Sequence, residues 1–178
     1  MALAAMTTMT LLTPLTAQAG PASAPAADTE AVATPPSCTA AEHRQFDFWL
    51  GHWDVHTPDG RLAGHNLIRR AAGGCALHEQ WSGRGGFRGE SLNGWNRETR
   101  QWQQALLDST GGRLDVVGGL HDGAMVLTGE TANPRRAGMK LQHRITWTPL
   151  ADGRVRQHWQ TSEDDGRTWP TTFDGLYT

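Results

Sequence analysis

The sequence has no long apolar run beyond its first residues and no excess of basic side chains. After Ala19, no apolar stretch approaches the roughly 18 to 20 residues that a membrane-spanning helix needs. All sixteen basic residues lie from Arg44 onward, and sixteen of the eighteen acidic residues lie from Glu42 onward. That part of the chain is therefore formally neutral, whereas nucleic-acid binding needs a strong basic excess. We expect no membrane span there and no nucleic-acid partner.

Several motifs of catalysis and metal binding are also missing. The chain contains no Gly-x-Ser-x-Gly, no His-Glu-x-x-His and no Cys-x-x-Cys. Among the eight histidines, His52 and His56 are four residues apart, which on a strand separates them by about 13 Å. The acidic turn at 162–168 lacks the ligand spacing of a calcium loop. We therefore predict no metal site and no cofactor.

The first residues have the character of an export signal. Residues 1–19 are small or apolar and end in Ala17-Gln18-Ala19, the A-x-A form of a signal-peptidase site. No Lys or Arg precedes Arg44, so the usual positive start of a signal is missing, and a buried N-terminal helix is the alternative. Residues 20–37 are rich in Ala, Pro and Ser, which predicts a disordered linker. We expect a periplasmic or secreted protein.

The chain has only two cysteines, Cys38 and Cys75. In an exported protein an even number favours a disulfide, which would contribute roughly 3 to 4 kcal/mol by closing a loop. The alternative is two unpaired thiols, with Cys75 acting as a small core residue.

Residues 38–178 alternate short β-type runs with Asp-Gly and Gly-Gly turns, and they contain no long helical stripe of apolar residues. The predicted strands are 48–56, 61–70, 75–82, 87–96, 101–109, 113–119, 123–130, 140–149, 154–162 and 169–177. One helical turn is expected around residues 40–46. About ten strands fit a sandwich or a barrel. The short connections favour an all-β, single up-and-down antiparallel β-barrel.

A Gly-x-Trp, Gly51 to Trp53, stands at the start of the first long strand. Glycine permits a tight bend of the backbone, and the indole two residues later points to the same face. We expect Trp53 to close one end of the barrel.

Strand alternation places isolated polar groups on the same faces as tryptophans. A structural barrel would carry aliphatic residues there, because an unpaired buried polar group costs roughly 1 to 3 kcal/mol. This pattern predicts an internal cavity for a small apolar or aromatic molecule. The proposed ligand-binding residues are Glu79, Trp81, Trp102, Gln104, His143, Trp147, Gln157 and Trp159. The alternative is that the polar groups pair with one another or lie at the rims.

Two functions remain open at this point, a carrier or sensor and a barrel enzyme. The enzyme would be an isomerase, cyclase or hydrolase with Glu79 as general acid or base, because desolvation raises the pKa of a carboxyl among apolar side chains. Asp108 and His143 are its candidate partners. Convergence of these three groups in one cavity would favour the enzyme, and their dispersal would favour the carrier.

Several blocks of the chain resemble a known family. The opening Phe46-Asp47-Phe48-Trp49-Leu50-Gly51-His52-Trp53-Asp54-Val55, with Gly74-Cys75-Ala76-Leu77-His78-Glu79-Gln80-Trp81 and Asp165-Gly166-Arg167-Thr168-Trp169, is similar to exported bacterial domains of unknown function. Those domains have lipocalin-like, calycin-type barrels, so the resemblance implies a barrel and no established activity. The Gly-x-Trp opening is more distantly similar to that of nitrobindin-like haem proteins. Those proteins carry an axial histidine in a C-terminal strand, whereas residues 172–178 of this chain contain no histidine.

Overall fold

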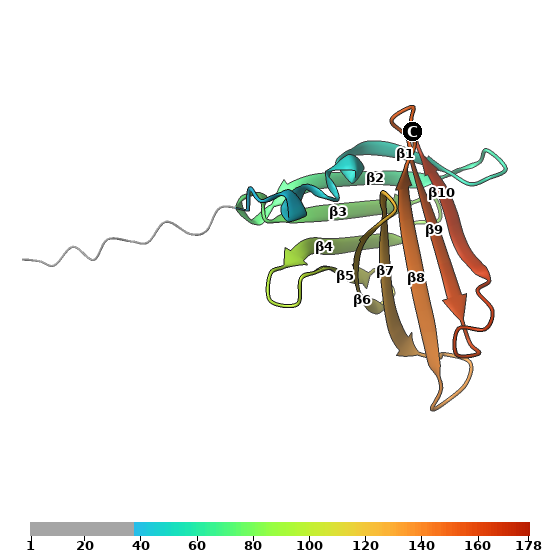
Figure 1. The fold of residues 1–178 in the computed structure, drawn as a ribbon. Coiled ribbons are helices and arrows are strands. Elements are labelled where there is room, and N and C mark those ends of the chain that lie inside the picture. The colour runs from blue at the N-terminus through green and yellow to red at the C-terminus, as the bar shows by residue number, and fades with distance from the viewer. Residues whose placement is uncertain (1–37) are drawn as a thin grey trace, which may run out of the picture. The chain divides into compact units, whose positions relative to one another are not determined.

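A computed structural model describes residues 38–178, so the expected signal peptide and linker lie outside the described residues. Ten antiparallel strands close into one up-and-down barrel, which confirms the predicted fold class (Figure 1). The strands are β1 Gly51–His56, β2 Leu62–Ala71, β3 Ala76–Gly83, β4 Arg88–Asn96, β5 Gln101–Asp108, β6 Arg113–His121, β7 Ala124–Ala132, β8 Lys140–Pro149, β9 Val155–Ser162 and β10 Thr171–Tyr177. Among residues 38–178, no helix is long and apolar enough to cross a membrane.

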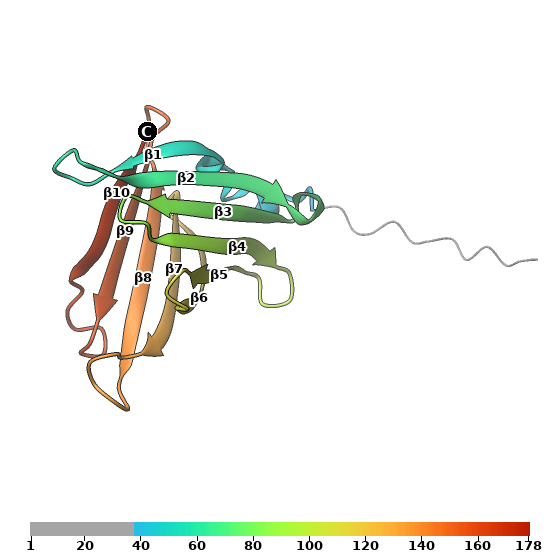
Figure 2. The same cartoon turned by 180° about the vertical axis from the view of Figure 1, so that it is seen from behind.

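Each strand pairs with its neighbours in sequence, and the first pairs with the last. This closure joins Val55 to Tyr177 in register and is extended by hydrogen bonds in both directions between Asp54 and Thr178, of 2.9 and 3.1 Å. Seen from both sides, β1 to β4 run steeply across the direction of β7 to β10 (Figures 1 and 2). Because the sheet closes on itself, it presents no free edge to a neighbouring chain.

A segment of single helical turns precedes the first strand and closes one end of the barrel. Its 3-10 turns are η1 Ala41–Arg44 and η2 Asp47–Trp49, and a third, η3 Ala72–Gly74, links β2 to β3. Because η2 occupies residues 47–49, β1 begins three residues later than predicted. We call the buried aromatic residues at this end the closed-end cluster; they are Phe46, Trp49, Trp102, Trp147 and Tyr177.

Phe46 and Trp49 fill this end of the barrel and are fully buried. The expectation that Trp53 would close the end named the wrong residue, because Trp53 is only partly buried beside them. Phe46 stacks on Trp49 with 4.8 Å between ring centroids, and both rings contact Trp147. Trp53 is only partly buried at the side of this cluster, where its indole donates to the carbonyl of Trp49 over 3.0 Å. The turn of η2 brings Trp49 inside, and no strand alternation could have indicated that.

Gly51 is required for the reason that the Gly-x-Trp pattern suggested. Its φ is +154°, a conformation that side chains rarely adopt, and an added Cβ would lie 2.8 Å from Cε2 of Trp53. Both the backbone conformation and the close approach of the indole therefore exclude a larger residue.

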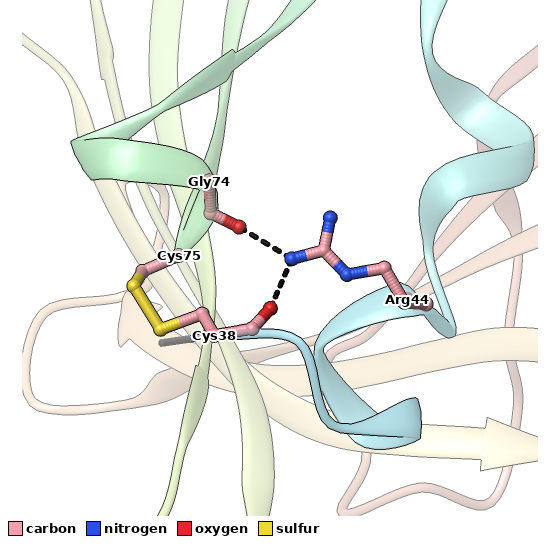
Figure 3. Close-up of a disulfide and its surroundings, with 4 residues drawn as sticks. All are labelled: Cys38, Arg44, Gly74 and Cys75. Carbon is pink, nitrogen blue, oxygen red and sulfur yellow. Dashed lines mark hydrogen bonds between the residues drawn. A yellow bond between two sulfur atoms is a disulfide. The ribbon is translucent and has the colours of Figure 1, made fainter. Parts of the chain in front are cut away.

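A Cys38–Cys75 disulfide ties the N-terminal segment to the connection between β2 and β3, as predicted (Figure 3). One Arg44 nitrogen, Nη2, donates to the carbonyl oxygens of both Cys38 and Gly74, the latter over 2.7 Å. The disulfide and this arginine therefore hold the segment that supplies Phe46 and Trp49 to the closed end.

Candidate functional site

Beyond the closed-end cluster, the barrel holds a cavity of about 340 Å³, within the size range of small-molecule sites. Its walls are mainly aromatic and aliphatic, with a few polar groups. The lining residues are Glu79, Trp81, Phe87, Gly89, Gln104, Leu106, Asp108, Ile145, Gln157, Trp159, Thr172 and Phe173. Phe87, in the β3–β4 hairpin, is 43% exposed, and Thr172 at the start of β10 is also exposed. The cavity lining therefore reaches the surface at Phe87 and at Thr172.

Five of the eight predicted ligand-binding residues line this cavity: Glu79, Trp81, Gln104, Gln157 and Trp159. Trp102 and Trp147 also face the interior, but they are fully buried in the closed-end cluster. On β5, Trp102 lies near the start of the strand, before the cavity-lining Gln104 and Leu106, and on β8 Trp147 follows the cavity-lining Ile145. Alternation identified the inner face correctly but carries no information on depth along the barrel.

His143 is buried beside the cavity wall and does not line the cavity. Its Nδ1 accepts a hydrogen bond from the Trp159 indole over 3.2 Å, so the ring nitrogen that carries the proton is Nε2, 2.9 Å from the Thr131 hydroxyl. Burial lowers the pKa of His143. A neutral imidazole in this pair fixes the orientation of one cavity-wall indole.

Asp108 lines the cavity, but its carboxylate organises the β5–β6 hairpin. Its Oδ1 accepts hydrogen bonds from the hydroxyl and backbone N–H of Thr110 and from the N–H of Gly112. These hydrogen bonds, those from Thr110 first, lower the pKa of Asp108. The carboxylate therefore remains ionised at neutral pH.

Glu79 lies at the centre of a buried polar network. Its Oε2 accepts the Ser91 hydroxyl proton over 2.6 Å, and its Oε1 accepts from the Asn66 amide over 2.8 Å. Only 7% of Glu79 is exposed. Burial raises its pKa, and the two hydrogen bonds and nearby His78 only partly oppose that shift.

The network extends from Glu79 in two directions. On one side, the Asn93 amide donates to the Ser91 hydroxyl, and the Gln104 amide donates to Asn93, each over 2.8 Å. This side leads to the cavity wall at Gln104.

On the other side, Asn66 donates to the Tyr177 hydroxyl over 3.1 Å, and Tyr177 donates to Gln157 Oε1 over 2.6 Å. Burial, and then the charge of Glu79, raise the pKa of Tyr177. The phenol therefore stays protonated and acts as a donor toward the cavity wall at Gln157.

The three candidate catalytic residues do not act on one another. Among residues 38–178, no hydrogen bond joins any two of Glu79, Asp108 and His143, and each is engaged by different partners. The same part of the chain contains no group of three or more His, Cys, Asp or Glu side chains arranged to hold a metal ion.

The sequence reasoning missed the residues that complete the network and part of the wall. They are Asn66, Ser91, Asn93 and Tyr177 in the network, and Phe87, Leu106 and Phe173 in the wall. Alternation in residues 87–96 groups Gly89, Ser91 and Asn93 on one face, and that signal could have identified two of them.

No protein-family model matches this chain, and no curated protein matches it. The closed ten-strand barrel is compatible with a lipocalin-like fold. The resemblance to exported bacterial domains stays an expectation from the sequence.

Proposed function

We propose that this protein binds a small apolar or aromatic molecule in the barrel cavity, as a carrier or sensor outside the cytoplasm. One observation carries the proposal. The cavity has aromatic walls, and its polar lining residues Glu79 and Gln104 belong to a buried hydrogen-bond network. If the barrel interior served only to stabilise the fold, side chains would fill this space, as they fill the closed end. The disulfide supports an oxidising compartment.

Most of the affinity would come from the walls. The Trp81 and Trp159 indoles, with the rings of Phe87 and Phe173, offer apolar surface on several sides of the cavity. Burying each indole against a ligand contributes on the order of 1 to 3 kcal/mol. The amides of Gln104 and Gln157 are held by the network and would orient a polar group of the ligand.

The structure favours a barrel enzyme less than a carrier or sensor. General acid–base chemistry needs an acid and a base that reach the same substrate atoms. Asp108 is committed to a hairpin and His143 to Thr131 and Trp159, so Glu79 has no matched partner in the cavity.

The test is a fluorescence titration with N-phenyl-1-naphthylamine, an apolar probe that brightens in dry sites. Gly89 lines the cavity on β4, and a Cβ there meets Leu106 at 3.5 Å, an ordinary contact. Gly89→Leu therefore introduces a side chain into the cavity. We expect it to weaken probe binding by about tenfold or more.

The matched control adds the same kind of bulk outside. Ala105 on β5 is exposed on the outer face, so Ala105→Leu should leave the probe affinity unchanged. A folded wild-type protein that does not bind the probe, or equal binding by Gly89→Leu, would contradict the proposal.

A further inference from the structure

Both charged residues in the cavity lining are acidic. Glu79 and Asp108 line it, and no Lys, Arg or His of residues 38–178 does. Two carboxyl groups without a basic counterpart favour a positively charged guest over a negative one, and the preference is strongest beside Glu79, of which only 7% is exposed. The charge of the lining thus constrains the class of ligand.

The deeper carboxyl lacks a counter-charge. Glu79 accepts hydrogen bonds from two neutral donors, Ser91 and Asn66. Among the described residues, it forms no salt bridge with any basic side chain, although eleven ion pairs lie elsewhere on the barrel. A buried carboxylate is costly unless it is paired. A cationic group of a ligand beside Glu79 would provide that pairing.

The surroundings suit a small ammonium group. Gln104 uses its amide nitrogen toward Asn93 and Ser91, so its Oε1 is left as an acceptor in the wall of the cavity that Glu79 also lines. The aromatic side chains of Trp81, Trp159 and Phe173 line the same cavity. Aromatic faces attract cations, and the attraction increases when water is excluded.

We propose that the cavity binds a small amphipathic primary amine, with its ammonium group against Glu79 and Gln104 Oε1 and its apolar body against Trp81 and Trp159. This inference rests on the proposed function and specifies its ligand class. A neutral ligand of the same shape would gain the wall contacts only.

Amine binding should release a proton. In the free protein, burial raises the pKa of Glu79, whereas an entering ammonium group would lower it and favour the carboxylate form. The other titratable groups near it are His78 on its own strand, paired outward with Glu90, Asp108 on β5 and Tyr177 on β10. Asp108 is already ionised and Tyr177 stays protonated, so the released proton is assigned to Glu79.

The experiment compares 2-(2-naphthyl)ethylamine with 2-(2-naphthyl)ethanol by titration calorimetry near neutral pH. We expect the amine to bind the wild type at least about tenfold more tightly. We also expect a heat that varies with the ionisation enthalpy of the buffer, as proton release requires. Glu79→Gln keeps the volume and should bring the amine to within about threefold of the alcohol, while binding of the alcohol persists.

The two possible failures are distinguishable. Equal binding of alcohol and amine to the wild type overturns the amine inference and leaves the proposed function standing, whatever the behaviour of Glu79→Gln. An amine preference that survives in a folded Glu79→Gln variant also overturns the inference. If neither compound binds a folded wild type, the proposed function fails and the inference fails with it.

Discussion

Ser91 on β4 donates its hydroxyl proton to Glu79 on β3 over 2.6 Å, inside the barrel. The same hydroxyl oxygen accepts from the amides of Asn93 and Gln104. One small side chain thus links the buried carboxyl to the amides that lead to the cavity wall.

Ser91→Ala should destabilise the protein by about 1 to 3 kcal/mol, because it leaves buried donors of Asn93 and Gln104 without their acceptor and removes a donor from Glu79. Urea unfolding followed by circular dichroism measures this loss. Ser82→Ala is the matched control, since Ser82 lies on the outer face of β3 and should change the stability by less than about 0.5 kcal/mol. Equal effects of the two substitutions would contradict the role of the network.

Glu79→Gln should change the stability in a pH-dependent way. Burial raises the folded-state pKa of Glu79 above its ordinary value of 4.5. As the pH rises above that value, the unfolded chain loses the proton while the folded protein retains it, so the wild type is progressively destabilised until the folded pKa is passed. Glutamine does not titrate.

The stability of Glu79→Gln relative to wild type should therefore increase as the pH rises above 4.5 and level off once the folded-state pKa of Glu79 is passed, as measured by urea unfolding at several pH values. Glu90→Gln is the control, because Glu90 is exposed on the outer face, where its carboxyl contacts His78 and not the interior network. A difference between Glu79→Gln and wild type that stays constant or shrinks as the pH rises would show that the carboxyl is not buried as described.

Removing the disulfide should cost about 3 to 4 kcal/mol through the loop that it closes. The Cys38→Ser, Cys75→Ser double variant tests this by urea unfolding, and a reducing agent should reproduce the loss in the wild type only. Because the disulfide anchors the segment that carries Phe46 and Trp49, the near-ultraviolet circular dichroism of the closed-end cluster should weaken as well. A loss below about 1 kcal/mol would indicate that Arg44 alone suffices to hold the segment.

Much of the barrel could be predicted from the sequence because turns and alternation are local signals. The Asp-Gly and Gly-Gly turns separate the strands, and alternation assigned Glu79, Trp81 and Gln104 correctly to the interior. Depth along the barrel depends on strand tilt and register, which no single strand encodes. Trp102 and Trp147 were therefore expected in the cavity wall and lie in the closed end.

The network was harder to predict because β4 inverts the usual pattern of hydropathy. Ser91 and Asn93 are almost fully buried, whereas Leu92 between them is 57% exposed. Hydropathy alone would place Leu92 inside and its neighbours outside. Only the partners on the two neighbouring strands, Glu79 on β3 and Gln104 on β5, make the polar face the favourable one to bury.

The most direct test of the central claim follows the indole N–H signals of the eight tryptophans by nuclear magnetic resonance during a titration with 2-(2-naphthyl)ethanol. Binding in the cavity should shift the signals of Trp81 and Trp159 saturably and leave that of buried Trp49 in place. Assignment by single Trp→Phe variants identifies each signal. The account is contradicted if no indole signal moves, or if the shifts are confined to Trp95 and Trp169, which do not line the cavity.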